Sequence, residues 1–145
     1  MRGRKPNKAE SIFGKAVINA VGCVACAKLG YDNDYPEPAE YVQFHHNPDK
    51  GSIKPHCHFF GYGLCPVHHQ GTTPGGQKIP EGEPVRHSPL GSHYTAFKEK
   101  VGTDLDNARY VWDRLPLEAQ DQIGELTGIW DFDELLKEDA KLRNY

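Results

Sequence analysis

The sequence predicts an α+β fold in which a small zinc-stabilised core of two strands and one helix is flanked by an N-terminal helix and a C-terminal helical segment. A Cys-x-x-Cys pair and a Cys-x-x-His pair lie 38 residues apart, and the residues that lead to the second pair read as two short strands ending in a helix. Apolar residues recur at helical intervals toward both ends of the chain, which predicts the flanking helices. At 145 residues, the chain suits a single domain.

The N-terminal helix is expected over residues 8–21. Asn7 and Glu10 have the spacing of a capping box, apolar residues recur after them at helical intervals, and Gly22 stops the helix. Residues 1–7, which precede this helix, are basic and polar, and we expect them to form a flexible terminus.

Two strands and a helix are expected in the middle of the chain. The segment EYVQFHH reads as a strand that carries His45 and His46 at its end. The segment FFGYGLC reads as a second strand, although Gly61 and Gly63 weaken that prediction. PVHHQ then begins a short helix, with Pro66 in its first turn.

Loops and further helices complete the predicted domain. Residues 29–40 and the Gly- and Pro-rich residues 71–91 read as surface loops. Helical segments follow, separated by glycine and proline residues. The domain therefore divides into a core over residues 8–102 and an acidic helical extension over residues 103–145.

Charge is unevenly distributed along the chain, whose net charge is −3. Residues 1–98 hold 11 Lys and Arg against 8 Asp and Glu, whereas residues 99–145 hold 6 against 12. The first part therefore suits a polyanion better than the total charge suggests. The sequence has neither an apolar run of roughly 20 residues nor a secretory signal, so we expect a cytoplasmic protein without a membrane span.

The strongest chemical signal is a set of four residues, here called the zinc clip: Cys23, Cys26, Cys65 and His68. Two closely spaced pairs suit tetrahedral zinc, because each pair can hold the ion from a tight turn while the intervening chain loops out. Disulfides are disfavoured in a reducing compartment, and the other reading is that the cysteines are small buried residues. A closed zinc site would be structural and would contribute folding free energy on the order of 10 kcal/mol.

Further histidines lie beside the zinc clip. His69 directly follows a clip residue, so its side chain points elsewhere from the same helical turn and could reach a second metal. His45 and His46 are adjacent on the first predicted strand, which sends their side chains to opposite sides. Packing the helix on the two strands would bring His45 to His69. His46 would then be free to act as a general base, because a neutral imidazole with a pKa of about 6.5 can accept a proton at cellular pH.

These motifs resemble those of a known class of nucleases. The order Cys-x-x-Cys, HH after a strand, and LCPVHH resembles the His-Asn-His (HNH) endonucleases of the ββα-metal class. More narrowly, HHNPDKGSIKPHCHFFGYGLCPVHHQG followed by SPLGSHYTAFKEKVG resembles the Ref family, phage-encoded RecA-dependent nucleases, over roughly residues 20–102. The resemblance implies an HNH-like ββα-metal core and a metal-dependent DNA endonuclease, encoded by a phage or prophage. Such an enzyme would hydrolyse a phosphodiester to a 3′ hydroxyl and a 5′ phosphate.

The same resemblance implies roles for individual residues. It makes the zinc clip the structural zinc set, His45 and His69 the ligands of a catalytic Mg²⁺, Mn²⁺ or second Zn²⁺, and His46 the general base. His58 falls where related members carry a histidine, so it completes the active-site shell or takes the place of the motif's central Asn. The implied partners are DNA and the RecA filament.

The basic terminus is a candidate for contacts with DNA phosphates. Its other reading is that of a soluble terminus with no binding role. The residues that would make these contacts are Arg2, Arg4, Lys5 and Lys8.

The alternative function is a non-catalytic, zinc-stabilised module that binds DNA or RecA. A zinc clip alone needs four ligands, so the extra histidines at nuclease positions favour the enzyme. Cys57 reads as a core residue, a spare thiol or a ligand in place of His68. His87 and His93 read as solvated loop histidines, although His93 could approach the active site, and the role of His56 stays open.

Overall fold

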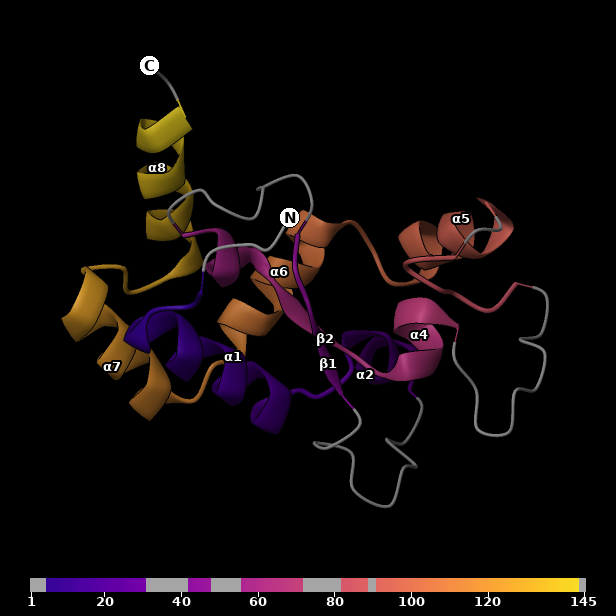
Figure 1. Cartoon of the computed structure of the whole chain (residues 1–145), viewed down its shortest axis with the longest axis horizontal. Helices are drawn as coiled ribbons and strands as arrows, with labels where there is room; N and C mark the ends of the chain where they lie inside the picture. The colour runs from indigo at the N-terminus through magenta and orange to yellow at the C-terminus, as the bar shows by residue number, and fades with distance from the viewer. Residues whose placement is uncertain (1–4, 31–41, 48–55, 72–81, 89–90, 144–145) are drawn as a thin grey trace.

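Figure 1 shows a computed structural model of the chain, which describes residues 5–30, 42–47, 56–71, 82–88 and 91–143. Helices surround a small antiparallel hairpin, which confirms the predicted α+β class. In chain order the elements are α1 (Lys8–Ala20), α2 (Val24–Leu29), β1 (Gln43–His45), the 3₁₀ helix η2 (Cys57–Phe60), β2 (Tyr62–Leu64), α4 (Pro66–Gln70), α5 (Gly91–Lys100), α6 (Asp104–Asp113), α7 (Leu117–Thr127) and α8 (Phe132–Arg143).

The first helix forms as its sequence predicts. The backbone N–H of Glu10 donates to Asn7 Oδ1 and that of Asn7 donates to Glu10 Oε1, both at 2.9 Å, which completes the capping box. The chain turns at Gly22, whose φ of 70° favours glycine. Helix α2 then begins between the two cysteines of the first clip pair and ends at Gly30 (φ 75°), so the predicted loop starts one residue later than expected. Most of that loop lies outside the described residues.

The predicted hairpin is present with shorter strands. Phe44 pairs with Gly63 and His45 with Tyr62 in an antiparallel register. One of the two glycines that weakened the prediction has a packing role, because a Cβ atom at Gly63 would lie 2.5 Å from the backbone oxygen of Gly22. The strand therefore needs glycine at this position to approach the turn that leads into α2.

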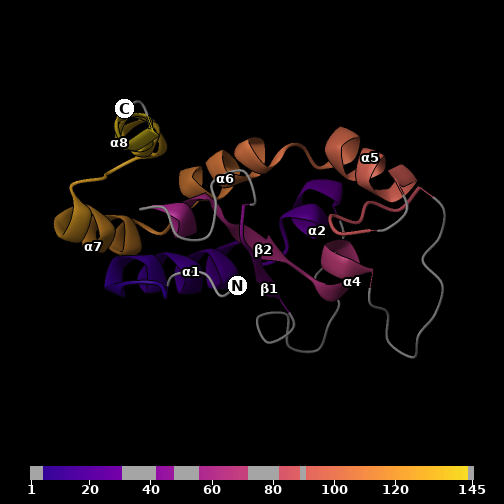
Figure 2. The same cartoon turned by 45° about the horizontal axis from the view of Figure 1, so that its top comes forward.

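Helices cover both faces of the hairpin. Figure 2 shows the hairpin between α1 and α6, and both helices contact β2. Helix α4 follows β2 directly with Pro66 in its first turn, as predicted, so the strand, strand, helix order is present. Helix α7 packs against α1, which places part of the C-terminal extension against the N-terminal helix.

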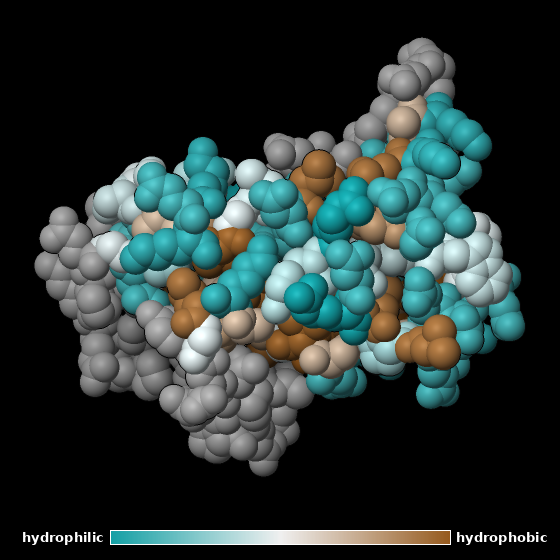
Figure 3. Space-filling view, turned by 180° about the vertical axis from the view of Figure 1, so that it is seen from behind, coloured by the Kyte–Doolittle hydropathy of each residue, from teal (hydrophilic) through white to brown (hydrophobic). Residues whose placement is uncertain are grey.

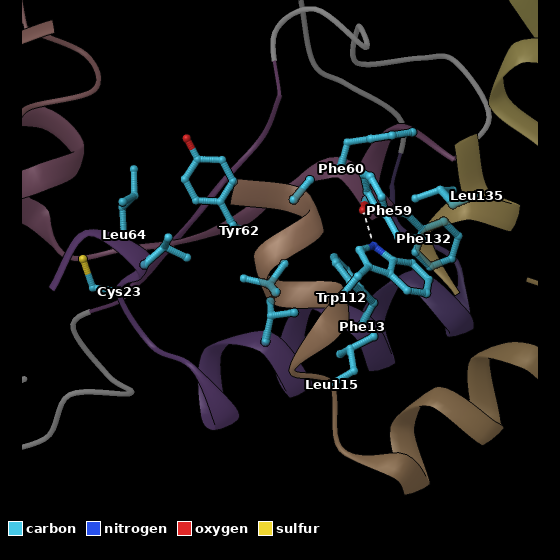
Figure 4. Packing of buried hydrophobic residues seen from close by; sticks show 14 of the residues in the cluster. Phe13, Cys23, Phe59, Phe60, Tyr62, Leu64, Trp112, Leu115, Phe132 and Leu135 are labelled. Carbon is cyan, nitrogen blue, oxygen red and sulfur yellow. Dashed lines mark hydrogen bonds between the residues drawn. The ribbon is translucent and has the colours of Figure 1, made fainter. Parts of the chain in front are cut away.

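Aromatic side chains form the centre of the core (Figure 4). The Phe13 ring lies 5.6 Å from the Phe59 ring and 5.2 Å from the Trp112 ring, measured between centroids. Trp112 Nε1 donates to the backbone oxygen of Phe59 at 2.8 Å. Phe59 and Phe60, expected in the second strand, lie instead in η2. Its 3₁₀ turn leaves that backbone oxygen for the indole N–H to bind. Burying each aromatic side chain contributes roughly 2–3 kcal/mol.

Apolar side chains of α1 are buried in the core, and the surface is mostly hydrophilic. Figure 3 shows hydrophilic side chains over most of the described surface seen from behind, including the projecting α8. Within the described residues, Lys8–Leu29 is long and apolar enough to cross a membrane by length and composition. The helix breaks at Gly22, however, and Phe13 and Val17 in α1 are fully buried against the core. Its apolar character is therefore that of a core helix.

Candidate metal centres

The four zinc clip residues converge where α2, β2 and α4 meet, and all four are buried. Cys26 Sγ lies 3.9 Å from Cys65 Sγ and 3.5 Å from His68 Nδ1, and Cys65 Sγ lies 3.2 Å from His68 Nδ1. Cys23 Sγ lies 3.7 Å from the same nitrogen. Tetrahedral zinc with Zn–S bonds of about 2.3 Å holds its sulfur ligands about 3.8 Å apart. The residues present therefore fit a tetrahedral divalent ion such as zinc.

Burial of three cysteine side chains in the zinc clip also favours a bound cation. Hydrogen bonds with Cys23 and Cys26 lower the pKa of Cys65, whereas hydrogen bonds with Cys23 and Cys65 raise the pKa of Cys26. The buried thiols cannot all ionise unless a positive charge offsets them. A bound metal ion supplies that charge, because the thiolate is the form that binds metal.

Residues 83–87, here called the strap, run along α4. The backbone N–H of Arg86 donates to the backbone oxygen of His68 at 2.8 Å, and that of His87 donates to the oxygen of His69 at 2.9 Å. These two bonds satisfy carbonyl groups near the C-terminal end of a short helix. They also fix the position of the His87 side chain relative to α4.

The strap supports the zinc clip through Glu83. Its Oε1 lies 2.9 Å from His68 Nε2, which holds the proton on Nε2 and leaves Nδ1 directed at the three sulfur atoms. His93 Nδ1 donates to the backbone oxygen of Glu83 at 2.7 Å, and Val85 N donates to the backbone oxygen of His93. The expectation of a solvated loop histidine at His93 is therefore wrong, because this side chain is 6% exposed and anchors the strap.

Three imidazoles, here called the histidine cluster, meet beside the zinc clip: His45 from β1, His69 from α4 and His87 from the strap. One ring nitrogen from each lies within 4.8 Å of the others. The ring centroids are 4.9 to 5.4 Å apart, and His87 Nε2 lies 3.1 Å from His45 Nδ1. Two imidazole nitrogens on one tetrahedral ion are about 3.3 Å apart, so the histidine cluster also fits a metal ion.

Polar side chains lie beside the outer ring nitrogens of two of these histidines. Gln43 Oε1 lies 2.6 Å from His69 Nδ1, so that nitrogen carries the proton and Nε2 stays available. His45 Nε2 lies 3.4 Å from Asp104 Oδ1, while Nδ1 of His45 faces His87 Nε2. Burial, followed by the nearby His45 and His87, lowers the pKa of His69 to about 4. Burial and His45 also lower the pKa of His87, so these rings are neutral at pH 7 and able to bind metal.

His46 faces the opposite side of β1 from the histidine cluster. Its ring lies 5.2 Å from the rings of Phe44 and His58, and His46 and His58 line a pocket of about 470 Å³ against α1. Burial and the neighbouring histidines lower the pKa of His46. Beside this pocket, Glu10, Cys57 and His58 are buried with ligand-type atoms within 4.8 Å of one another. Cys57 is thus a buried residue, as expected, and lies outside the zinc clip.

The structure brings most predicted site residues together in two groups. His45 and His69 meet as predicted, whereas His46 and His58 lie side by side on the other face of β1. His87 is exposed, in keeping with its prediction as a loop histidine, but that prediction missed its contact with His45. No fixed spacing relates His87 to the other histidines, so the sequence carries no local signal for it.

The basic terminus leads toward the His46 side of the molecule. Lys5 and Lys8 are exposed at the start of α1, and Arg2 and Arg4 lie outside the described residues. Pro6, between the two lysines, lines the same pocket as His46.

Comparison with known proteins identifies the family. A search of curated proteins found no match. A family model described as "Recombination enhancement, RecA-dependent nuclease" matches residues 9–115, about three quarters of the chain, including the zinc clip and the histidine cluster. The match confirms the narrower resemblance, to the RecA-dependent nucleases, and it ends before α7. The chain therefore belongs to the recombination-enhancement, RecA-dependent nuclease family.

Proposed function

We propose that this protein is a metal-dependent DNA endonuclease of the HNH class that cuts DNA engaged by a RecA filament. The observation that carries the proposal is the meeting of His45, His69 and His87, three imidazoles from separate segments, beside a zinc clip. Membership of the RecA-dependent nuclease family supports the choice of DNA and RecA as partners. The order β1, β2, α4 supports the HNH class, because it places one ligand on a strand and another on the following helix.

The histidine cluster would hold the catalytic ion. Imidazole ligands suit Zn²⁺ and also bind Mn²⁺. Mg²⁺ loses its waters reluctantly, so it would keep several of them at such a site. When bound, the divalent ion would supply Lewis-acid stabilisation of the leaving 3′ oxygen. The protein's part is to present His45 Nδ1 and His69 Nε2 toward one point, which Asp104 and Gln43 favour through the opposite ring nitrogens.

His46 would act as the general base. It is neutral at pH 7 because burial and neighbouring histidines lower its pKa, so it can accept a proton from water. His45 and His46 are adjacent, so their Cα atoms are about 3.8 Å apart. Because successive side chains of a strand point to opposite sides, the two rings lie on either side of one strand end. A phosphodiester placed across this end would meet the metal-binding side and the base side together. His58 would complete the site by packing against the His46 ring.

The basic terminus would hold DNA on the His46 side. Lys15 lines the pocket that contains His46, and the terminus enters α1 at the pocket's rim. Cationic side chains here would neutralise phosphates and align the strand by electrostatic attraction. The terminal residues proposed for this role are Arg2, Arg4, Lys5 and Lys8.

A nicking assay tests the proposal. Wild-type protein, His46→Ala and the control Gln70→Ala would be compared on supercoiled DNA and on RecA-paired DNA, with Mg²⁺ or Mn²⁺. Gln70 is an exposed residue of α4 next to His69, so its loss tests nonspecific damage to that helix. We expect His46→Ala to slow cleavage by roughly 10²- to 10⁴-fold, the range for loss of a general base, and Gln70→Ala to leave it unchanged.

Each outcome of this assay decides one part of the proposal. Equal cleavage by wild type and His46→Ala would remove His46 as the base. Equal cleavage with and without RecA would remove the RecA dependence. No cleavage by the wild-type protein under any condition would support the alternative of a zinc-stabilised module that binds DNA or RecA without chemistry.

A further inference from the structure

Asp104 lies at the start of α6, buried beside the histidine cluster. Its Oδ1 accepts a hydrogen bond from the Tyr62 hydroxyl at 2.6 Å and another from Arg86 Nε at 3.0 Å. Its Oδ2 accepts from Arg86 Nη2 at 2.7 Å, so Arg86 holds the carboxylate with two parallel bonds. The carboxylate is thus held from β2 and from the strap, and its orientation is fixed independently of His45.

The same carboxylate faces the His45 ring, whose outer nitrogen is buried without a hydrogen bond to any described residue. Among the residues that the structure describes, His45 Nε2 is the buried side-chain atom without a hydrogen bond, and it lies 3.4 Å from Asp104 Oδ1. An approach of about 0.4 Å would bring this pair to ordinary hydrogen-bond length. Buried polar atoms are rarely left unpaired, and metal-binding histidines commonly donate their second N–H to a carboxylate.

We propose that Asp104, held by Arg86 and Tyr62, is a positioning residue that keeps the proton of His45 on Nε2 and so directs Nδ1 into the histidine cluster. The inference rests on the proposed function, because it assigns the cluster as a metal site. It adds a residue from α6 and gives Arg86 a second purpose. The backbone N–H of Arg86 binds the strap to α4, and its guanidinium holds the Asp104 carboxylate next to His45.

The tautomer of His45 gives a test that is measured in the wild-type protein. Nitrogen-15 NMR of the histidine rings distinguishes an Nε2–H from an Nδ1–H imidazole. A His45→Gln spectrum assigns the signal. We expect the Nε2–H form for His45 at neutral pH. An Nδ1–H form would overturn the proposal, since the proton would then occupy the nitrogen that faces the cluster.

Titration with Co²⁺ then measures what the carboxylate contributes to metal binding. The zinc clip is first loaded with zinc, so that added Co²⁺ can bind only elsewhere. Visible absorption without thiolate charge-transfer bands then reports cobalt bound to imidazoles. We expect Asp104→Asn to weaken Co²⁺ binding by roughly 10- to 100-fold, the usual cost of losing such a partner. Tyr62→Phe removes one bond to Asp104 and should have a smaller effect in the same direction. The control is Asp106→Asn, because Asp106 caps the same helix turn and pairs with Thr103 instead.

The outcomes separate this inference from the proposed function. Equal Co²⁺ affinity in wild type, Asp104→Asn and Tyr62→Phe would overturn the positioning role and leave the metal site in place. If wild type binds no Co²⁺ at the histidine cluster, the proposed metal site fails, and the His45 tautomer alone then decides the positioning role. If Asp104→Asn does not fold, the comparison rests on Tyr62→Phe and the tautomer.

Discussion

Replacing Gly63 by Ala is the sharpest test of how the hairpin holds the zinc clip. A Cβ atom there would lie 2.5 Å from the Gly22 backbone oxygen and 2.8 Å from Val42 Cγ1. Because the closest atom belongs to the backbone, β2 or the Gly22 turn must move. Gly22 directly precedes Cys23 and Gly63 lies two residues before Cys65, so this movement would separate the two clip pairs. Overpacking of this kind costs roughly 1–3 kcal/mol.

Thermal unfolding and zinc competition would measure the effect. A chain of this size loses roughly 2–4 °C in Tm per kcal/mol, so we expect Gly63→Ala to lower Tm by about 2–12 °C and to weaken zinc binding. Gly91→Ala is the matched control, because a Cβ atom at Gly91 meets nothing within 4 Å. A Gly63→Ala protein with the Tm and zinc affinity of the Gly91→Ala protein would refute the close-approach reasoning.

Two further predictions concern the metal sites. Cys26→Ser should release one zinc and unfold the protein, because a structural zinc contributes on the order of 10 kcal/mol and a whole domain has about 5–15 kcal/mol of stability; unchanged zinc content and an unchanged melting curve would contradict this. Stability should also fall with acid, since the folded pKa of His69, about 4, lies below the ordinary value of 6.5. The contribution of neutral His69 to the free energy of unfolding is complete above about pH 6.5 and is lost as the pH falls toward 4. The urea midpoint should therefore fall more steeply over that range in wild type than in His69→Asn. Equal slopes for the two proteins would refute this prediction.

The zinc clip could be predicted from the sequence because its geometry is mostly local. Each pair of ligands comes from one turn of chain, so the spacing alone limits where the side chains can point. The meeting of His45 and His69 needed only one further step, since a strand, strand, helix order brings the end of β1 to α4. Predictions of this kind succeed where short segments with clear patterns set the geometry.

His87 and His93 could not be predicted because long-range contacts place them. His87 reaches the histidine cluster because the strap donates backbone hydrogen bonds to α4, and His93 is buried because it binds the Glu83 backbone. Neither interaction leaves a periodic or spaced pattern in the sequence. Gly63 was misread for the same reason, because a glycine that weakens an isolated strand can be required where another backbone approaches it.

The two candidate metal sites share helix α4 and the strap. Helix α4 has five residues, and a helix this short is unstable without tertiary contacts. Its consecutive residues His68 and His69 face different sites, and the strap pairs with the backbone oxygen of each. The strap then contributes Glu83 behind the zinc clip and His87 to the histidine cluster. We therefore expect an ion in the zinc clip to stabilise α4 and the strap, and so to hold His69 and His87 in place in the histidine cluster.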